Sequence, residues 1–513
     1  MNNLNLKQLQ NGSDIRGVAI EGVPNEPVNL TPEVVKRLGC AFIHWLAEKV
    51  NKTPSELKVA VGRDSRISGQ NLMTAVTDGM TAIECQVYDV GIASTPAMFM
   101  STVTPELNCD GAIMLTASHL PYNRNGLKLF TAQGGLDKSD ITNLLNLAKT
   151  VEVPTESHSN LITPYDFISV YAQILVQMVR EGVKHPQNYD QPLKGLKIIV
   201  DAGNGAGGFY AEKVLQPLGA DTTGSQFLDP DGTFPNHVPN PENNEAMASI
   251  CQAVEKHNAD FGIIFDTDVD RGAAVDETGR ELNRNRLIAL ISAIVLKEHS
   301  GSTIVTDSIT SEGLTKFIEE ELGGVHHRFK RGYKNVINEA IRLNEMGQES
   351  WLAIETSGHG AMKENYFLDD GAYLVTKLLI ELAQSKQEGR SLTDLIANLE
   401  EPLESEEFRL KIQADDFKAY GNQVIEELQA FAKQQEDWHI VPNNYEGVRI
   451  SCQSPKEQGW FLLRLSLHDP VIPLNIESNV AGGVNEIAGR LREFFEKFEA
   501  LDLSALPAME GSV

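Results

Sequence analysis

Short apolar runs alternate along this chain with longer stretches of helical periodicity. The runs LKVAVGRD (57–64) and GAIMLT (111–116) predict buried strands. Residues 31–50 carry apolar positions at helical spacing, and Thr31 followed by Pro32 is typical of an N-cap with proline in the first turn. Strands that alternate with helices in this way predict α/β layers.

A strand running into a loop opens three successive segments. LKIIVDAGNGAGG follows the polar stretch near residues 152–159, and STIVTDSITS opens another segment at residue 302. From about Glu404 the pattern changes to strands FRLKI and FLLRLSL around a helix, which is typical of an α+β domain. The chain is too long for one core. We therefore predict three similar α/β mixed-sheet domains and a C-terminal α+β domain, at 1–158, 159–298, 299–402 and 403–513.

Residues 116–128, TASHLPYNRNGLK, follow the apolar run GAIML. Ser118 stands beside His119 in a loop-forming stretch that ends at Lys128. A strand that delivers a hydroxyl to a polar loop flanked by a histidine and a lysine is typical of phosphoryl chemistry. An ordinary serine-rich turn is the alternative that this segment alone leaves open.

A second segment, FGIIFDTDVDRG (261–272), runs from an apolar strand into three acids. Asp266, Asp268 and Asp270 alternate, and Arg271 follows them. Three carboxylates so spaced can converge on one hard cation such as Mg²⁺. A solvated acidic turn is the alternative, but acids packed against a strand end repel one another unless a cation lies among them. Arg271 beside that ion is a natural phosphate anchor.

Together these segments resemble the α-D-phosphohexomutase family of phosphoglucomutases, phosphomannomutases and phosphoglucosamine mutases. The family carries TASHNP…NGxK, a magnesium loop DGDADR, a sugar loop GExSGH and a phosphate loop RxSNTxP. Here the same order holds, with ETSGHG (355–360) and RLSLHDP (464–470) completing the set. Supporting matches along nearly the whole chain are SDIRG (13–17), VGRDSRISG (61–69), GIASTP (91–96), VDAGNGAGG (200–208) and FPNHVPNPE (234–242).

This resemblance implies a heart-shaped molecule with a central active-site cleft and one site loop from each of four domains. It implies that phosphorylated Ser118 exchanges its phosphoryl group with a hexose monophosphate through a hexose 1,6-bisphosphate. Glucose is the favoured sugar and mannose the second. The implied cofactors are Mg²⁺, held by the three aspartates and a phosphoserine oxygen of Ser118, and glucose 1,6-bisphosphate as activator.

The resemblance also assigns roles to single side chains. Lys128, His119 and Arg271 supply positive charge or proton transfer, and His359 is the candidate general acid/base. Glu355 and Ser357 bind the sugar hydroxyls O3 and O4. The distal phosphate falls to Arg464, Ser466 and His468, and the mouth of the site is lined by Arg16, Arg63 and Arg66.

Composition limits the partners. Asp and Glu number 71 against 44 Lys and Arg, for a formal charge of −27, which argues against nucleic acid or anionic membrane as a partner. We expect small-molecule sugar phosphates as ligands and a monomer or weak homo-oligomer. The five cysteines lack CxxC spacing, so neither disulfides nor zinc are indicated. No signal peptide or long apolar span is found, so we expect a cytoplasmic protein, or a stromal one if the source is a plastid-bearing eukaryote.

Several positions depart from the family pattern. Leu120 stands where asparagine is usual, Arg124 stands near the end of the serine loop, and Thr267 and Val269 replace glycine and alanine in the magnesium loop. In the phosphate loop Leu467 lacks the hydrogen-bonding groups of asparagine, and Asp469 adds negative charge close to a phosphate. KRGYKN (330–335) also differs from some relatives. A looser grip on phosphate leaves open a hexose 1,6-bisphosphate synthase, which releases the bisphosphate and is refilled by a donor such as fructose 1,6-bisphosphate.

Two further alternatives come from other classes. IIFDTDV also fits the DxDx[TV] pattern of haloacid-dehalogenase-type phosphatases, in which Asp266 would be the nucleophile. A non-catalytic sugar-phosphate sensor would need neither Ser118 nor Lys128, so their presence argues against it. The glycine-rich DAGNGAGG could cradle phosphate, but we interpret it as a structural turn.

Overall fold

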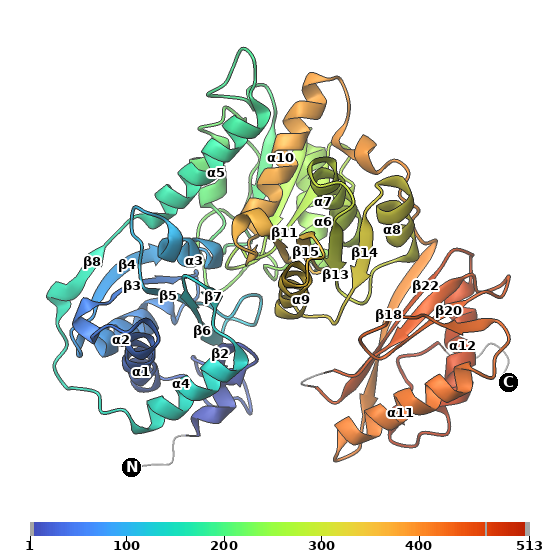
Figure 1. The fold of residues 1–513 in the computed structure, drawn as a ribbon, viewed down its shortest axis with the longest axis horizontal. Helices are drawn as coiled ribbons and strands as arrows, with labels where there is room; N and C mark the ends of the chain where they lie inside the picture. Colours follow the sequence, from blue (N-terminus) through green and yellow to red (C-terminus); the bar gives the residue numbers. More distant parts are fainter. Residues whose placement is uncertain (1–4, 467–468, 508–513) are drawn as a thin grey trace. The chain divides into compact units, whose positions relative to one another are not determined.

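The computed structural model describes residues 5–466 and 469–507 (Figure 1). The chain divides into two compact units, Met1–Asn283 with Ser357–Asp394 and Arg284–Thr356 with Leu395–Val513. Each unit has sheets and a hydrophobic core of its own. Within the described residues, no helix is both long and apolar enough to cross a membrane.

An eight-stranded mixed sheet opens the first unit. The neighbours β3, β4, β5 and β8 run parallel to one another. Strand β6 pairs antiparallel with β5, and β2 pairs antiparallel with β6. In spatial order the strands are β1 (Gln10–Asn11), β2 (Asp14–Val18), β6 (Arg124–Thr131), β5 (Gly111–Leu115), β3 (Lys58–Arg63), β4 (Gln86–Ile92) and β8 (Ile162–Pro164), with β7 (Gly134–Gly135) paired to β6. The predicted strands at 57–64 and 111–116 are thus confirmed as β3 and β5.

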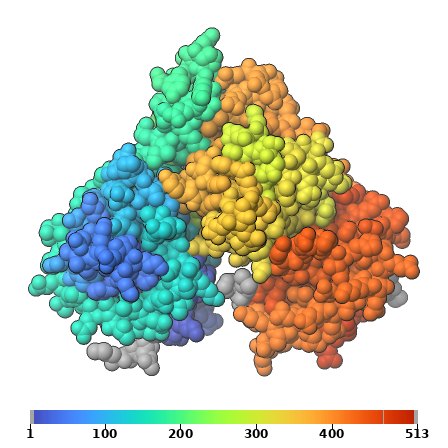
Figure 2. Space-filling view, viewed as in Figure 1, coloured from blue at the N-terminus to red at the C-terminus, as the bar shows by residue number. Residues whose placement is uncertain are grey.

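Helices connect the strands of this sheet along the chain and follow its last strand. They are α1 (Pro32–Val50), α2 (Gly69–Thr81), α3 (Thr95–Val103), α4 (Lys138–Thr150) and α5 (Phe167–Val183), with short 3₁₀ turns η1 (Leu6–Leu9), η2 (Pro54–Glu56) and η3 (Ser159–Leu161). The predicted helix at 31–50 is confirmed, because Thr31 accepts a hydrogen bond from the Val34 amide and Pro32 is the first helical residue. In the space-filling view, the green segment that contains α5 forms a projection at the top (Figure 2).

The first unit also contains a four-stranded sheet, and the aspartate loop follows one of its strands. Its order is β12 (Glu281–Leu282), β11 (Gly272–Asp276), β10 (Phe261–Phe265) and β9 (Ile198–Asp201), with the π-helix η4 (Tyr210–Leu215) and α6 (Asn244–His257). The unit also contains the hairpin of β16 (Gly360–Met362) and β17 (Leu368–Asp369), η6 (Lys363–Asn365), α10 (Gly371–Gln387) and most of the short η7 (Leu392–Ile396). Because β9 and β10 are parallel, their carboxyl ends meet at one edge, where DAGNGAGG and the aspartate loop begin.

The glycine-rich turn packs against the aspartate loop. A Cβ on Gly205 would lie 2.7 Å from the Thr267 carbonyl oxygen, and the Ala206 amide donates to that same oxygen at 2.8 Å. A side chain at Gly205 would therefore displace the loop. These contacts support the interpretation of DAGNGAGG as a structural turn.

The second unit contains two sheets. The parallel strands β14 (Val325–Arg328), β13 (Thr303–Thr306) and β15 (Ser350–Ile354) come with α7 (Arg284–Glu298), α8 (Glu312–Lys316), the π-helix η5 (Phe317–Glu321) and α9 (Tyr333–Glu345). The C-terminal sheet is antiparallel, in the order β19 (Trp438–Ile440), β20 (Val448–Cys452), β21 (Gly459–Leu463), β22 (Val471–Ser478), β18 (Glu404–Ile412) and β23 (Leu501–Asp502), with α11 (Phe417–Ala432) and α12 (Gly483–Phe495).

The predicted fold class, α/β layers followed by a C-terminal α+β domain, is confirmed. The domain boundaries stay a prediction. The strand predicted from FLLRLSL ends earlier than expected, at Leu463. Beyond Leu463 the backbone still follows the register of the β21–β22 pair, because the Arg464 amide donates to the Pro473 carbonyl and the Ser466 amide to the Val471 carbonyl, both at 3.1 Å.

Candidate active site

Ser118 follows β5 in a tight, buried turn. Its backbone lies in the left-handed region with φ 50°, an uncommon conformation for a non-glycine residue that often marks functional sites. The turn is held from within, because the Ser118 amide donates to Thr116 Oγ1 at 2.9 Å and that hydroxyl donates to Asp64 at 2.7 Å.

Arg66 clamps the serine loop from the protein side. We expected it at the mouth of the site, but its side chain is buried. It pairs with the buried Asp64 at 3.2 Å. Its guanidinium also donates to the carbonyls of Ser118 at 2.5 Å, Leu120 at 2.6 Å, Pro121 at 2.7 Å and Arg124 at 3.0 Å. Arg66 therefore fixes the shape of the loop that presents Ser118.

Replacement of Arg66 by methionine should destabilise the first unit. It leaves Asp64 as an unpaired buried charge and removes the donors to four carbonyls, a change that typically costs about 3–5 kcal/mol. Scanning calorimetry should show the lowest thermal transition shifted down. Arg409→Met, which removes an exposed pair with Glu407, should leave the transition nearly in place. Equal transitions for the two variants would contradict the clamp.

The three aspartates converge at the end of β10, as predicted. All are buried, and their ligand oxygens lie within 4.8 Å of one another. Asp268 and Asp270 each keep one buried oxygen, Oδ1, that has no hydrogen-bond partner among the described residues. Buried carboxylate oxygens of this kind fit a hard divalent cation. The predicted acidic triad is therefore able to bind a metal ion.

The backbone of the aspartate loop is under strain. Val269, between two of the acids, has φ 66°, an outlier for a β-branched residue. The Gly371 amide donates to its carbonyl at 3.1 Å. From the start of α3, Thr95 donates its hydroxyl to Asp268 at 2.5 Å and its amide to the Asp268 carbonyl at 2.8 Å. These contacts hold the conformation that turns the acids toward one point.

Two of the acids have displaced pKa values in opposite directions. Burial, together with the charges of Asp270 and Asp268, raises the pKa of Asp266 well above its usual value. Burial also acts to raise the pKa of Asp270, but Lys128, His359 and Arg271 outweigh it and hold that pKa below the usual range. The mutual repulsion is the physical signature of a site that gains stability from a cation.

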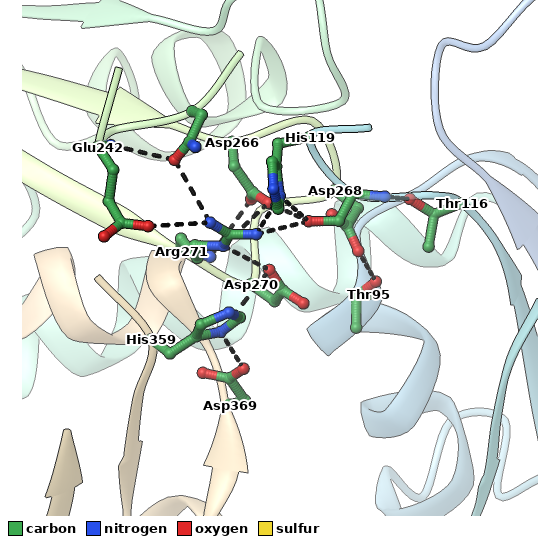
Figure 3. A network of polar contacts seen from close by, with 12 residues as sticks. Thr95, Thr116, His119, Glu242, Asp266, Asp268, Asp270, Arg271, His359 and Asp369 are labelled. Carbon is green, nitrogen blue, oxygen red and sulfur yellow. Dashed lines mark hydrogen bonds and ion pairs between the residues drawn. The ribbon is translucent and has the colours of Figure 1, made fainter. Parts of the chain in front are cut away.

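Lys128 and Arg271 join the acids to Ser118, and Figure 3 shows the Arg271 side chain next to Asp266, Asp270 and His119. The Lys128 ammonium lies 3.1 Å from Asp268 and in contact with Asp270. Arg271 donates from Nη2 to Ser118 Oγ at 2.9 Å, and Ser118 Oγ donates to Asp266 at 3.0 Å. The nucleophile candidate thus lies between a carboxylate and a guanidinium.

His119 does not have the charge that we expected of it. Burial, followed by the charges of Arg271 and Arg16, lowers its pKa to about 2. Its Nδ1 contacts the Arg271 guanidinium, so this nitrogen is the acceptor. At neutral pH His119 is uncharged, and it orients Arg271 and Ser118 without adding positive charge.

His359 lies on the other side of the acids, paired with Asp369. Its Nδ1 contacts Asp369 and lies 4.0 Å from Asp270. Burial acts to lower the pKa of His359, but the Asp369 carboxylate outweighs it and the pKa is raised. Burial raises the pKa of Asp369 to about 6 against the opposing charge of His359. The pair can therefore hold and release a proton near neutral pH.

Asp369→Asn should lower the pKa of His359, because the charge that favours the imidazolium is removed. If the reaction needs protonated His359, the fall in kcat on the alkaline side should begin at lower pH in the variant. The kcat–pH profile measures this shift, with Asp276→Asn, another buried acid of this unit, as the control. A profile equal to that of the wild type would contradict the role of the pair.

The remaining predicted residues lie in different surroundings. Arg16 pairs with Asp14 at 2.9 Å and is close enough to affect His119. Arg63 donates to the Asp64 carbonyl and is not among the contacts of Ser118 that the described residues show. Ser357 is buried in the first unit.

Glu355, Arg464 and Ser466 belong to the second unit. Glu355 is buried and accepts the Gly332 amide at 2.6 Å. Burial lowers the pKa of the Arg464 guanidinium and the nearby Arg331 lowers it further, so two arginines lie close together there. His468 and Leu467 lie outside the described residues.

Sequence reasoning assigned no role to Thr95 or Asp369. Thr95 lies in GIASTP, which we used only as a supporting match, and its partner Asp268 is 173 residues away. Asp369 follows no motif that we used. Ser94, which accepts the Ala97 amide as N-cap, and the proline after Thr95 are the local signals that a helix N-terminus lies there.

Comparison with known proteins extends these observations to the whole chain. The family descriptions "Phosphoglucomutase/phosphomannomutase, alpha/beta/alpha domain" I, II and III match residues 7–152, 176–279 and 283–402. A phosphomannomutase/phosphoglucomutase of Pseudomonas syringae is 30% identical over 457 residues, 88% of this chain and 90% of the relative. The chain belongs to the phosphoglucomutase/phosphomannomutase family.

Other members of the family agree. A phosphoglucomutase of Neisseria gonorrhoeae is 28% identical over 485 residues, 94% of this chain and 95% of the relative. The crystal structure of a phosphoglucomutase/phosphomannomutase family protein from Burkholderia thailandensis superposes with a TM-score of 0.75 at 27% identity, covering 97% of this chain and 98% of that one. These matches confirm the family resemblance. They do not support the bisphosphate-synthase or phosphatase alternatives.

Proposed function

We propose that this chain is a phosphohexomutase that interconverts hexose 1-phosphate and hexose 6-phosphate, with glucose favoured and mannose second. One observation carries the proposal: Ser118 Oγ is buried between Asp266, at 3.0 Å, and Arg271, at 2.9 Å. A carboxylate and a guanidinium on one serine oxygen can accept its proton and stabilise a phosphoryl group on it. Membership of the family supports the same reaction.

Each half reaction exchanges one bond for another. A hydroxyl of the sugar phosphate attacks the phosphoryl group on Ser118, so that a sugar O–P bond forms, the Ser118 Oγ–P bond breaks and the hydroxyl proton leaves. The bisphosphate then reorients in the site, and Ser118 Oγ accepts the other phosphoryl group from it. Arg271 and Lys128 stabilise the negative charge on the moving group. The His359–Asp369 pair is our candidate for moving the proton.

Asp266, Asp268 and Asp270 would hold Mg²⁺, with a phosphoserine oxygen of Ser118. The ion would neutralise charge on the transferring phosphoryl group when bound. Asp268 and Asp270 each have a buried oxygen without a hydrogen-bond partner among the described residues, and these two oxygens support this choice of site. Glucose 1,6-bisphosphate would serve as the activator that phosphorylates Ser118.

Sugar phosphates are the ligands that we propose, with Glu355 and Ser357 on the ring hydroxyls and Arg464 and Ser466 on the distal phosphate. The formal charge of −27 favours neither nucleic acid nor anionic membrane as a partner. We infer a monomer or weak homo-oligomer in the cytoplasm, where phosphorylated sugars are available.

A ³¹P NMR time course tests the proposal. The protein is mixed with Mg²⁺, glucose 1-phosphate and a trace of glucose 1,6-bisphosphate. Glucose 6-phosphate should appear while the bisphosphate stays catalytic. Release of inorganic phosphate without glucose 6-phosphate, or accumulation of bisphosphate after addition of fructose 1,6-bisphosphate, would overturn it. Mannose 1-phosphate in a parallel run measures the sugar preference.

A further inference from the structure

His237 is a buried histidine that the reaction above does not use. It lies in FPNHVPNPE, the segment between the glycine-rich turn and α6. Its Nε2 lies 3.0 Å from both carboxylate oxygens of Asp201, and its Nδ1 lies 3.0 Å from the Val238 carbonyl oxygen. A carbonyl oxygen and a carboxylate can only accept hydrogen bonds. These contacts fit a ring that carries a proton on both nitrogens, an imidazolium.

The surroundings of His237 favour that charge. Asp201, at the end of β9, also accepts the Gly203 amide at 2.9 Å and Gln226 Nε2 at 2.7 Å. The other charged group that faces His237 is Glu245, at the start of α6, and the ring of Phe227 packs edge-on against it. Burial acts to lower the pKa of His237, but Asp201 outweighs it and the pKa is raised.

The segment that His237 anchors leads directly to the active site. The Val238 carbonyl that it binds also accepts the Asn240 amide at 2.8 Å. Asn240 Oδ1 in turn accepts from Arg271 Nη1 at 3.3 Å, and Glu242 lies 3.9 Å from the same nitrogen. In Figure 3 the Arg271 side chain lies between Glu242 and His119. The other end of this guanidinium holds Ser118.

Close packing leaves the segment little freedom on its inner side. A Cβ on Gly203 would lie 2.8 Å from Pro239 Cβ and 3.3 Å from His237 Cε1. The glycine-rich turn and FPNHVPNPE therefore fit directly against each other. Movement of the His237 ring would displace Pro239 and the residues after it.

We propose that His237, as an imidazolium bound to Asp201, is a positioning residue that sets the direction of Arg271 toward Ser118. Among the described residues, its hydrogen bonds and ring contact go to Asp201, Val238 and Phe227 and not to Ser118 or the three aspartates. When His237 loses one proton, a ring nitrogen turns its lone pair toward an acceptor oxygen of Asp201 or Val238. The resulting repulsion loosens the turn at Val238 and weakens the hydrogen bond between Asn240 and Arg271. The expected effect on kcat rests on the proposed mutase reaction. The protonation of His237 and its contacts with Asp201 and Val238 do not depend on that reaction.

The charge state of His237 can be measured without activity. The full chain is labelled with ¹⁵N-histidine, and the His237 signal is assigned by its loss in His237→Gln. At pH 7, where an unperturbed histidine is mostly neutral, both His237 nitrogens should show the chemical shift of a protonated imidazolium. A neutral tautomer at this pH would overturn the proposal.

Kinetics test the effect on Arg271. His237→Gln keeps a single donor group, and kcat should fall on the order of tenfold while KM changes much less, as expected when a reacting group is misplaced. Asp201→Asn should move the alkaline fall in kcat to lower pH, because it weakens the hold on the His237 proton. His44→Gln, on the exposed face of α1, should match the wild type.

The outcomes separate this proposal from the proposed function. If the wild type converts no hexose phosphate, the mutase reaction is wrong, and the NMR spectrum still decides the charge of His237. If the wild type is active and His237→Gln matches His44→Gln in kcat and pH profile, the positioning role is overturned. Should His237→Gln fail to fold, the His237 signal is assigned instead by its change in Asp201→Asn, and the wild-type spectrum together with the pH profile of Asp201→Asn decides the question.

Discussion

Replacement of Ser118 by alanine should abolish interconversion of hexose phosphates. The alanine methyl group cannot carry a phosphoryl group between the two ends of the sugar. Loss of a covalent nucleophile typically lowers kcat by more than about 10³-fold. The ³¹P NMR time course should show no glucose 6-phosphate, and mass spectrometry should detect no phosphoserine in this loop after incubation with glucose 1,6-bisphosphate.

Ser65→Ala is the matched control for this variant. Ser65 is a second buried serine of the first unit, and its hydroxyl has no hydrogen-bond partner among the described residues. Its loss should change neither activity nor phosphoserine formation. The Ser118 variant should also keep its fold, because Arg66 still clamps the loop through carbonyls. Phosphate release or interconversion that persists in Ser118→Ala would point to Asp266 as the nucleophile and contradict our mechanism.

Much of the fold could be predicted because the signals are local. The apolar run before Ser118 is β5, and Thr31 with Pro32 begins α1. These elements follow from hydrophobic spacing and capping within a few residues. The strand in FLLRLSL ends at Leu463, although the amides of Arg464 and Ser466 still donate to the Pro473 and Val471 carbonyls in the register of the β21–β22 pair. The spacing of apolar residues gives no sign of that end.

The candidate site could be predicted as a set of residues but not as a charge distribution. Resemblance placed Ser118 with Asp266, although 148 residues separate them. It did not show that His119 would be buried against Arg271, or that burial and that guanidinium would lower its pKa. Nor did it show Arg66 inside the protein, because an arginine in a loop motif gives no sign of whether it faces solvent or backbone carbonyls. Such properties depend on neighbours that only the folded chain brings together.

Asp268→Asn should nearly eliminate divalent-metal binding and with it catalysis. The change keeps the size of the side chain and an oxygen able to accept from Thr95, but it removes one negative charge from the group of acids. A hard cation depends on that charge. Isothermal titration calorimetry with Mg²⁺ should show affinity reduced on the order of 100-fold, and phosphoryl transfer should fall with it.

Thermal unfolding separates loss of the metal from damage to the fold. A cation that binds only the folded state stabilises it by about 2.7 kcal/mol at a concentration of 100 Kd, so Mg²⁺ should raise the Tm of the wild type but not of Asp268→Asn. Without Mg²⁺ the variant should be at least as stable as the wild type. One of the charges that raise the pKa of Asp266 is gone, and Lys128 still has Asp270 as a partner.

Asp276→Asn is the control for that experiment. Asp276 is also a buried acid of the first unit, at the far end of β11, where it accepts the amides of Thr278 and Arg280. Asparagine can still accept both bonds, so this variant should respond to Mg²⁺ as the wild type does. A Tm of Asp268→Asn that still rises with Mg²⁺ would show that the ion binds elsewhere. A metal-free Tm far below that of the wild type would show instead that the fold needs the contacts of Asp268 with Lys128 and Thr95. The charges of the carboxylates would then be balanced by cationic side chains of the protein and not by a metal ion.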